Sequence, residues 1–306
     1  MRERHRPMDL DWLKDFLVLA ERRNFSRAAH ARNVTQPAFS RRIRALEDWI
    51  GTPLFVRGAQ GATLTPSGVH FRPIAEEMMR VLHRGRRETK AMGEREASLS
   101  IAATHALSFT FFPHWIRKHL HFQELGTLNL ISDSMEGCEE IMLGGEVDFL
   151  LCHYHADAPT RFEADQFQRI SVGSDTLVAV CAPDAEGHGL WPLATTSERT
   201  SRLLAYSQAS GLGRILSAQQ GKRGGADGLE TVFTSHHAAT LMTMALEGHG
   251  VAWLPQTLVE DELAHGRLVR AGPEAADIPV EIRLFRSCDT RNSAADGLWA
   301  LLNNER

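Results

Sequence analysis

The 306-residue sequence contains only four cysteines, and none of them forms a C-x-x-C pair; they are Cys138, Cys152, Cys181 and Cys288. Cysteines scattered in this way do not indicate a disulfide framework. Most of them lie in apolar runs, where a free cysteine packs as a small hydrophobic side chain. We therefore expect free thiols in a reducing compartment.

The sequence also has no long apolar segment. The N-terminal stretch MRERHRPMDLDWL begins with charges but has no apolar run after them, so it does not resemble a signal peptide. No other stretch approaches the roughly 18 apolar residues that a membrane span needs. We expect a cytoplasmic protein without a membrane partner.

Common catalytic motifs are missing as well. The sequence has no G-x-S-x-G elbow, no phosphate-binding loop and no H-E-x-x-H pair. His153 and His155 alternate at strand spacing and could share a face, as could His119 and His121. Two histidines without further ligands make a weak metal site. We therefore expect no enzymatic activity, no cofactor and no bound metal.

The charges are distributed unevenly. The overall net charge is -4, but residues 1–92 carry a net charge of +8 and the remainder carries -12. A basic N-terminal module on an acidic body favours a polyanionic partner for the first part only. The length and the 43% hydrophobic content allow about two domains.

Two closely spaced helix starts lie in Asn24–Gly51, NFSRAAHARNVTQPAFSRRIRALEDWIG. Ser26 is predicted to cap a helix that ends near Arg32, and Thr35 is predicted to cap a second helix with Pro37 in its first turn. Gly51 ends the second helix as a left-handed cap. Two helices joined by a tight turn indicate a helix-turn-helix.

The second helix is amphipathic. Phe39, Ile43, Leu46 and Ile50 form its apolar stripe, and Gln36, Ser40, Arg41 and Arg44 lie off that stripe. Polar groups at the start of such a helix can contact base edges in a major groove, while flanking arginines bind phosphates. The same pattern also fits an ordinary surface helix with a solvated basic face.

The next segment favours the DNA-binding alternative. Two short runs in TPLFVRGAQGATLTPSG flank a glycine-rich turn at 58–61, which predicts a two-stranded wing with Arg57 near its tip. Thr65 and Pro66 then start another helix. Local patterns alone therefore predict a winged helix-turn-helix.

These residues also carry a family resemblance. The motifs N-F-S-x-A-A, V-T-Q-P-A-F-S-R-x-I-x-x-L-E, G-x-x-L-F-x-R and L-T-P-x-G follow one another from Asn24 to Gly68. Their order resembles the N-terminal domain of LysR-type transcriptional regulators. A weaker resemblance continues through the rest of the chain, including Gly248–Val269, which is similar to the family's second-lobe signature.

The resemblance implies specific DNA contacts and a regulatory role. We expect Gln36, Pro37, Ser40 and Arg41 to face the groove, with Thr35 at the helix start among the DNA-binding residues. The residues expected at phosphates are Ser26, Arg42, Arg57 and Thr65. Double-stranded promoter DNA is the implied partner, a homodimer or homotetramer the implied assembly, and RNA polymerase a further candidate partner.

A long helix is predicted from residue 66 to residue 92, followed by a polar hinge at 93–98. Its apolar residues form a discontinuous stripe among charges: Val69, Ile74, Met78, Val81 and Leu82. The alternatives are a helix that packs on its own domain and one that pairs with a second helix. In the LysR-type family the equivalent helix forms an antiparallel dimer, and the resemblance implies the same here.

After the hinge, strands and helices alternate, which predicts helices around a largely parallel sheet. The resemblance implies a two-lobed α/β domain like periplasmic binding proteins. The predicted domains are residues 1–65 for the winged helix-turn-helix, 66–97 for the linker and dimerisation helix, and 98–306 for effector binding. Within the last domain, lobe I comprises 98–170 and 272–306, and lobe II comprises 171–271.

Several polar side chains follow the predicted strands, where ligands of open α/β sheets bind. Hydroxyl and N–H groups at helix starts favour small polar or anionic ligands, although each could be a simple helix cap. The predicted effector-binding residues are Thr104, His105, Ser134, Tyr206, Ser207, Ser235 and His236. The resemblance places the inducer cleft of the family between these strand ends.

Two rival functions stay open. A solute-binding protein would share the C-terminal fold, but it would have a signal peptide and no DNA-binding domain. An oxidant-responsive regulator is the other alternative, because Asn24–Glu47, Ile101–Pro113 and Tyr206–Leu216 resemble the hypochlorite-responsive branch of the family. Its trigger would be oxidation of methionine or cysteine, although Cys181 alone cannot supply the second-lobe pair that peroxide sensors use.

Overall fold

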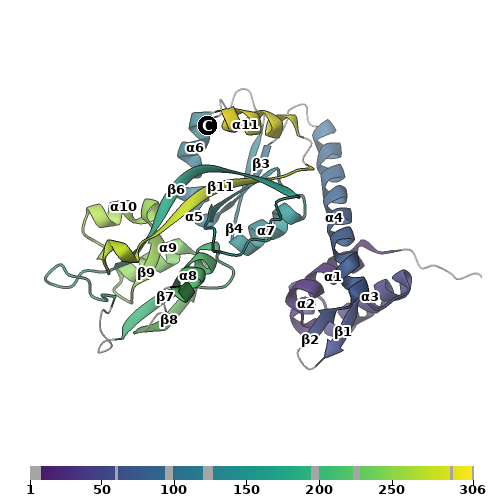
Figure 1. The fold of residues 1–306 in the computed structure, drawn as a ribbon, viewed down its shortest axis with the longest axis horizontal. Coiled ribbons are helices and arrows are strands. Elements are labelled where there is room, and N and C mark those ends of the chain that lie inside the picture. Colours follow the sequence, from purple (N-terminus) through teal and green to yellow (C-terminus); the bar gives the residue numbers. More distant parts are fainter. Residues whose placement is uncertain are drawn as a thin grey trace, which may run out of the picture. The chain divides into compact units, whose positions relative to one another are not determined.

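The computed structural model describes residues 8–58, 61–93, 99–119, 127–193, 200–222, 228–289 and 292–304. The chain divides into two compact units, the first formed mainly by residues 1–88 and the second mainly by residues 89–306. Figure 1 shows the helices and strands of both units. None of the helices in these residue ranges is long and apolar enough to cross a membrane.

The first unit is a three-helix core with a wing. Its elements are α1 (Leu10–Arg22), α2 (Phe25–Ala31), α3 (Gln36–Ile50), β1 (Phe55–Gly58), β2 (Gly61–Leu64) and α4 (Pro66–Gly93). The predicted stripe of α3 is confirmed, since Phe39, Ile43 and Leu46 are buried in this core. Phe16 of α1 joins the parts, because its ring packs 5.4 Å from Phe55 of the wing and 5.2 Å from Phe71 of α4.

The caps of these helices differ in part from the prediction. Asn24, not Ser26, caps α2, because its side chain accepts a hydrogen bond from the Arg27 N–H. Thr35 lies at the N-cap of α3, but its hydroxyl caps no N–H group in the described part of the chain. Gly51 ends α3 with φ 86°, as predicted.

The predicted wing is present. β1 and β2 pair in antiparallel register from Phe55 opposite Leu64 to Gly58 opposite Gly61. The wing is tied to α1 by the hydrogen bond from the Ala62 N–H to the Arg23 carbonyl at 2.8 Å. Gly61 has φ 110°, and a Cβ there would lie 2.2 Å from the same carbonyl oxygen, so only glycine fits.

Helix α4 has two faces with different surroundings. Ala75 and Met79 are buried in the core of the first unit, which therefore extends beyond the wing. The five apolar residues of the predicted stripe are all exposed: Val69, Ile74, Met78, Val81 and Leu82. The hinge predicted at 93–98 lies outside the described residues, except for Gly93.

The second unit contains a seven-stranded sheet and a separate pair of strands. The strands of the first are β3 (Leu99–Thr104), β4 (Leu128–Asp133), β5 (Phe149–Tyr154), β6 (Phe167–Cys181), β9 (Ala252–Pro255), β10 (Val269–Arg270) and β11 (Ile278–Ser287). Their order is β10-β6-β11-β5-β3-β4, with β9 also paired to β6. The parallel pair consists of β7 (Ser201–Tyr206) and β8 (Leu229–Ser235).

The sheet is mixed, which corrects the expectation of a largely parallel one. β3 pairs in parallel with β4 and β5, but β6 and β11 are antiparallel and lie side by side along most of their length (Figure 1). Both strands are longer than their apolar runs suggested, because their outer residues alternate between polar and apolar. The predicted lobe boundary at residues 170 and 171 falls inside β6.

Two hydrophobic cores lie toward opposite ends of the paired strands β6 and β11. The helices of the second unit are α5 (His105–Thr110), α6 (Phe112–His119), α7 (Met135–Leu143), α8 (Gly211–Lys222), α9 (Ala238–Leu246), α10 (Gln256–Ala264), η1 (Glu274–Ala276) and α11 (Ser293–Asn304). Lobe I packs α5, α6 and α11 on one end of the sheet. Lobe II packs α8, α9 and α10 around the other end of the sheet and β7. The two lobes predicted from the resemblance are thus present.

Candidate functional site

The turn between α2 and α3 brings the two helices of the helix-turn-helix together. Asn33 adopts a left-handed conformation with φ 52°, and the Val34 N–H donates to the Ala29 carbonyl at 3.0 Å. Ala28 and Ala29 of α2 are buried, which allows the close packing of α2 against its neighbours. This geometry fixes the direction in which α3 presents its polar face.

The first turns of α3 present polar groups to solvent. Gln36, Pro37 and Arg41 are exposed, and Ser40 is half-buried beside them. They lie off the stripe that α3 buries in the core. Side chains at the N-terminal part of a recognition helix are the ones that contact base edges in helix-turn-helix complexes.

The other helix of the motif contributes to the same surface. The Ser26 hydroxyl of α2 lies 3.4 Å from Oε1 of Gln36 and can donate to it. Ser26 also lines a shallow surface hollow with Arg22, Arg27 and His30, so the residues around it are basic. The sequence pattern did not indicate this hollow, because its residues come from both ends of the α1–α2 turn.

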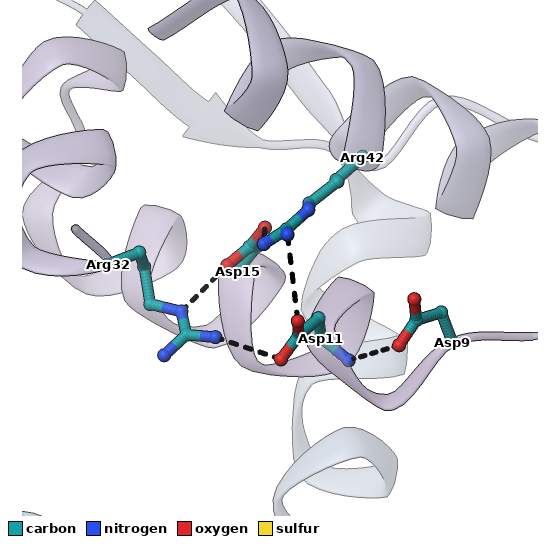
Figure 2. A network of polar contacts seen from close by, with 5 residues as sticks. All are labelled: Asp9, Asp11, Asp15, Arg32 and Arg42. Carbon is teal, nitrogen blue, oxygen red and sulfur yellow. Dashed lines mark hydrogen bonds and ion pairs between the residues drawn. The ribbon is translucent and has the colours of Figure 1, made fainter. Parts of the chain in front are cut away.

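Arg42 lies in an ion-pair network inside the first unit (Figure 2). Its guanidinium is 3.4 Å from Asp15 and 3.6 Å from Asp11, and Arg32 reaches the same two carboxylates at 2.7 and 3.2 Å. The Asp15 side chain is fully buried, whereas Arg42 is 32% exposed. The network therefore links all three helices, and contact of Arg42 with a phosphate stays a prediction.

Two further predicted phosphate contacts also have local partners. The Arg57 guanidinium lies 4.2 Å from the centre of the Phe25 ring, which positions the side chain at the wing. The Thr65 hydroxyl donates to the Pro53 carbonyl at 2.8 Å and accepts from the Gly68 N–H at 3.0 Å. Thr65 therefore starts α4 as predicted and fixes its position against the wing.

A pocket lies between the two lobes of the second unit. It has an empty volume of about 390 Å³, part of which is open to solvent. Four of the predicted effector residues line it: Thr104, His105, Ser134 and His236. They lie at or directly after the ends of β3, β4 and β8. The fold therefore brings these four residues together at one pocket, as expected for residues at strand ends.

The remaining predicted effector residues, Tyr206, Ser207 and Ser235, do not line this pocket. The Ser207 N–H donates to the Ser235 carbonyl at 3.0 Å, and the Ser235 hydroxyl accepts from the His237 N–H at 3.1 Å. Burial raises the pKa of Tyr206, and its hydroxyl has no hydrogen-bond partner in the described ranges. The hydrogen bonds of Ser207 and Ser235 join the segments that follow β7 and β8.

The sequence pattern missed several residues of the pocket, namely Ala106, Asp133, Met135, His153, Ser210, Gly211, Leu212 and Ala238. Ser210 follows β7 and precedes α8, so the strand-end argument could have found it. Only the residues directly after the strand were considered, up to Ser207, although the helix was predicted to begin at Gly211, where α8 does begin. His153 lies at the carboxyl end of β5, so the same reasoning could have found it as well.

The Thr104 hydroxyl differs in its hydrogen bonding from the serine hydroxyls that line the same pocket. Oγ1 of Thr104 is buried and has no hydrogen-bond partner among the residues that the structure describes. Ser134 and Ser210, by contrast, accept hydrogen bonds from the N–H groups of Gly137 and Gly213 and so cap α7 and α8. An unsatisfied buried hydroxyl is costly, so the Thr104 hydroxyl can take part in a further hydrogen bond.

Burial and neighbouring side chains shift the pKa of two histidines at the pocket, His105 and His237. Burial is the main influence that lowers the pKa of His105, and the neighbouring His237 lowers it further. Burial and His236 lower the pKa of His237. Asp133, which lines the pocket, opposes both shifts. Both shifts favour the uncharged form of His105 and His237.

A buried polar cluster lies next to the pocket and includes His153, which lines it. Asp175 of β6 accepts hydrogen bonds from the Thr257 hydroxyl at 2.6 Å and the Thr176 N–H at 2.7 Å, and Nε2 of His153 lies 3.5 Å away. Desolvation raises the pKa of Asp175, but the interactions with His153, Thr257 and Thr176 together outweigh it. Its pKa therefore lies below the usual range.

The two lobes are joined by direct contacts next to the pocket. Arg214 of α8 donates to both carboxylate oxygens of the buried Glu139 in α7, at 2.7 and 2.9 Å. The Glu136 N–H donates to the Ala209 carbonyl at 3.2 Å. Met135 packs so tightly on Gly211 that a Cβ there would lie 3.1 Å from its Cγ. Specific polar and apolar contacts thus join the two lobes beside the pocket.

The cysteines are placed unfavourably for redox chemistry. Cys138, Cys152 and Cys181 are buried, and only Cys288 is exposed. Burial raises the pKa of Cys138 to about 12 and also raises the pKa of Cys152 and Cys181. Protonated, buried thiols react slowly with oxidants.

Comparisons with known proteins agree with this arrangement. Residues 10–69 match the family described as "Bacterial regulatory helix-turn-helix protein, lysR family", and residues 92–306 match the family described as "LysR substrate binding domain". Among curated proteins, the chain is similar to the HTH-type transcriptional regulator YjiE of Escherichia coli K12. The two are 31% identical over 293 residues, which is 95% of this chain and 93% of the relative.

Solved structures show the same similarity. The chain resembles DarR from Vibrio fischeri, solved in complex with DNA, with 28% identity and a TM-score of 0.57 over 98% of this chain and 99% of that one. It also resembles full-length HypT from Salmonella typhimurium, described as a hypochlorite-specific LysR-type transcriptional regulator. There the identity is 29% and the TM-score 0.57, over 97% of this chain and 98% of that one.

Proposed function

The chain belongs to the LysR-type family of bacterial transcriptional regulators, and from this premise we propose that a small polar or anionic effector controls its binding to promoter DNA. We infer that the chain has no enzymatic activity, because the family and the relative that it matches are described as regulatory proteins. In the proposed mechanism α3 binds the DNA, and the pocket between the two lobes holds the effector.

For DNA binding, we assign base contacts to Gln36, Pro37, Ser40 and Arg41, with Thr35 at the entrance of the groove. The exposed polar face at the start of α3 carries this assignment. The proposed phosphate contacts are Ser26, Arg42, Arg57 and Thr65. Phosphate contacts position a protein on the duplex, while base contacts give it specificity.

Selection of DNA sites from a random pool with the purified chain tests the DNA-binding proposal. We expect an enriched sequence with two inverted half-sites, because a symmetric dimer binds symmetric DNA. Enrichment of no sequence above non-specific binding would contradict sequence-specific recognition.

For effector binding, the unpartnered Thr104 hydroxyl is the observation that carries the proposal. A ligand oxygen or N–H group that bonds to it would remove the cost of an unsatisfied buried group. Ser134, Ser210 and the N–H groups at the starts of α7 and α8 lie at the same pocket and favour polar or anionic groups.

Thermal unfolding against a panel of small carboxylates, amino acids, aromatic acids and phosphates tests this proposal. A ligand at 100 times its dissociation constant stabilises the protein by about 2.7 kcal/mol, which gives a measurable shift. We expect Thr104→Ala and Ser134→Ala to abolish the shift. Thr243→Ala removes a similar hydroxyl from α9, away from the pocket, and should leave the shift intact.

An oxidant is the second candidate trigger, and Met135 favours it. Its side chain is 8% exposed and packs on Gly211 of the other lobe. Oxidation to the sulfoxide would place a polar oxygen in this contact and change the closure of the lobes. We expect hypochlorite to alter DNA binding, methionine sulfoxide reductase to restore it, and Met135→Leu to remove the response. Met142→Leu, in the same helix, is the control.

We further propose that the chain acts as a homodimer or as a homotetramer of two dimers. The exposed apolar residues of α4 support this proposal, because an exposed apolar row on a long helix fits a second helix. Effector binding would then change the angle between dimers and the bend in the DNA, and with it the access of RNA polymerase to the promoter.

A further inference from the structure

Three histidines from two lobes meet at the cleft. His105 begins α5 in lobe I, and His236 and His237 lie between β8 and α9 in lobe II. The ring centre of His105 is 4.1 Å from that of His237, and the rings of His236 and His237 are 4.2 Å apart. Ring nitrogens of all three lie within 4.8 Å of one another.

We propose that His105, His236 and His237 form a binding site for a divalent transition-metal ion, for which Zn²⁺ is the best match. The inference rests on the proposed function in one respect, since it takes the cleft as the place where the regulator receives its signal. The metal would be the effector itself or the group that holds an anionic effector.

The donor set is the first argument for this metal. Imidazole nitrogens suit Zn²⁺, and three histidines with one open position form a common zinc site. Zn–N bonds of about 2.05 Å place the nitrogens of a tetrahedral site about 3.4 Å apart. Side-chain rotations can close the distances seen here. His236 is exposed and His105 and His237 are partly exposed, so an ion can reach the site.

The surroundings of His105 are the second argument. Nδ1 of His105 lies 2.9 Å from the Ser132 hydroxyl, and that hydroxyl lies 2.8 Å from the Ser108 hydroxyl. Metal-binding histidines almost always donate their second ring N–H to a hydrogen-bond acceptor, which fixes the ring and its tautomer, and the Ser132 hydroxyl can serve as that acceptor. With Nδ1–H donating to Ser132, Nε2 of His105 is the nitrogen that would bind the ion.

The charges favour a cation over a simple anion. Asp133 lines the same pocket and would repel an anion placed among the histidines. Its carboxylate instead attracts a cation, either directly or through a bound water.

The position of the site gives the ion a regulatory effect. One ligand belongs to lobe I and two belong to lobe II, so a single ion would join the lobes. Because all three ligands are available only when the lobes are close, metal binding would stabilise that arrangement over a more open one. The open coordination position could accept water or an oxygen of an anionic effector.

The full-length protein, freed of metal with a chelator, provides the test. Zn²⁺ binding is measured by competition with a coloured chelator, and Co²⁺ is used to detect the absorption bands of a tetrahedral site. The variants are His105→Ala, His236→Ala and His237→Ala. His188→Ala is the matched control, because its side chain is 83% exposed in lobe II and lies outside the cluster.

We expect one Zn²⁺ per chain and a loss of affinity of about 100-fold or more in each cluster variant, at or above the 10–100-fold cost of losing an outer-shell partner. His188→Ala should bind like wild type, and Zn²⁺ should raise the unfolding temperature of wild type but not of His105→Ala. Circular dichroism of each variant establishes that it is folded. Equal Zn²⁺ affinity of wild type and His105→Ala, or no binding by wild type, would overturn the proposal.

DNA binding separates this failure from a failure of the proposed function. If the metal-free protein selects a specific DNA site and responds to an organic ligand without binding Zn²⁺, only the metal site is refuted. If it selects no DNA site at all, the proposed function fails, whereas the Zn²⁺ titration of the histidine variants still decides the metal site.

Discussion

Arg41 and Arg42 are adjacent in α3, but their side chains lie in different surroundings. Arg41 is exposed on the polar face of the helix. Arg42 is directed toward the fully buried carboxylate of Asp15. One residue is thus free to contact DNA, and its neighbour helps to hold the three helices together.

Replacing Arg41 with alanine is expected to weaken binding to the selected DNA site by about 1–3 kcal/mol and to relax specificity at one base position. The reason is the loss of a guanidinium that can form two hydrogen bonds with a base edge. Binding is measured by fluorescence anisotropy at fixed salt. Arg117→Ala removes an exposed arginine from the second unit and should have no effect; unchanged affinity of Arg41→Ala would exclude it from base recognition.

The buried Asp15 allows a comparison of its two partners. Arg32→Ala should lower the free energy of unfolding of the first unit more than Arg42→Ala, since Arg32 makes the shorter contact with Asp15, 2.7 Å against 3.4 Å. We expect a loss of about 1–3 kcal/mol for Arg32→Ala, because a buried carboxylate loses its best hydrogen bond. Denaturant unfolding measures both variants, and a larger loss in Arg42→Ala would contradict this order.

Asp175 predicts a pH dependence of stability. Its pKa in the folded state lies below its value in the unfolded chain. The stabilisation is therefore present above the unfolded pKa of about 3.9 and is lost as the pH falls through the folded value. Asp175→Asn should lower stability at neutral pH and show a weaker decrease on acidification. If the two proteins lose stability in parallel between neutral and acidic pH, this role of Asp175 is wrong.

At the scale of elements, α4 combines a buried face with an exposed one. Phe71, Ala75 and Met79 pack in the core of the first unit, while the residues of the predicted stripe face outward. Pro73 lies inside the helix without ending it. The two faces explain why the helix pattern was discontinuous, since each face uses its own apolar residues.

A double change on the exposed face tests its role in assembly. Val81→Glu with Leu82→Glu should shift the protein to smaller species, because four carboxylates would face one another in a helix pair of a dimer. Light scattering coupled to size-exclusion chromatography measures the mass. Val232→Glu changes an exposed apolar residue of β8 and serves as the control. An unchanged mass of the double variant would exclude this face from the interface.

At the scale of the whole molecule, the two units have separate cores. Their charges also differ, with the excess of basic residues in the N-terminal part and the excess of acidic residues in the remainder. Separate cores favour folding of the second unit without the first.

Deletion of residues 1–92 should therefore leave effector binding intact and abolish DNA binding. The fragment keeps the residues of the pocket between the lobes but loses the helix-turn-helix and the wing. Thermal shifts with the ligands of the full-length protein, and anisotropy with the selected DNA, measure the two activities. Residual specific DNA binding by the fragment would contradict the assignment of that function to the first unit.

The sequence by itself determined the features that depend on neighbouring residues. The stripe of α3, the left-handed cap at Gly51, the wing and the start of α4 at Thr65 were all predicted correctly, because helix periodicity and turn chemistry act within a few residues. The cap of α2 was assigned wrongly to Ser26, because Asn24 offers the same chemistry two residues earlier. The two-lobed fold was predicted from the family resemblance and not from local patterns.

Only the tertiary structure decided which distant residues meet. No local pattern shows that Arg42 pairs with Asp15, that His153 lies beside Asp175, or that His105 contacts His237. The full length and antiparallel pairing of β6 and β11 were also hidden, because strand partners are set by packing and not by the strand's own residues. The candidate sites lie where the chain brings such distant segments together.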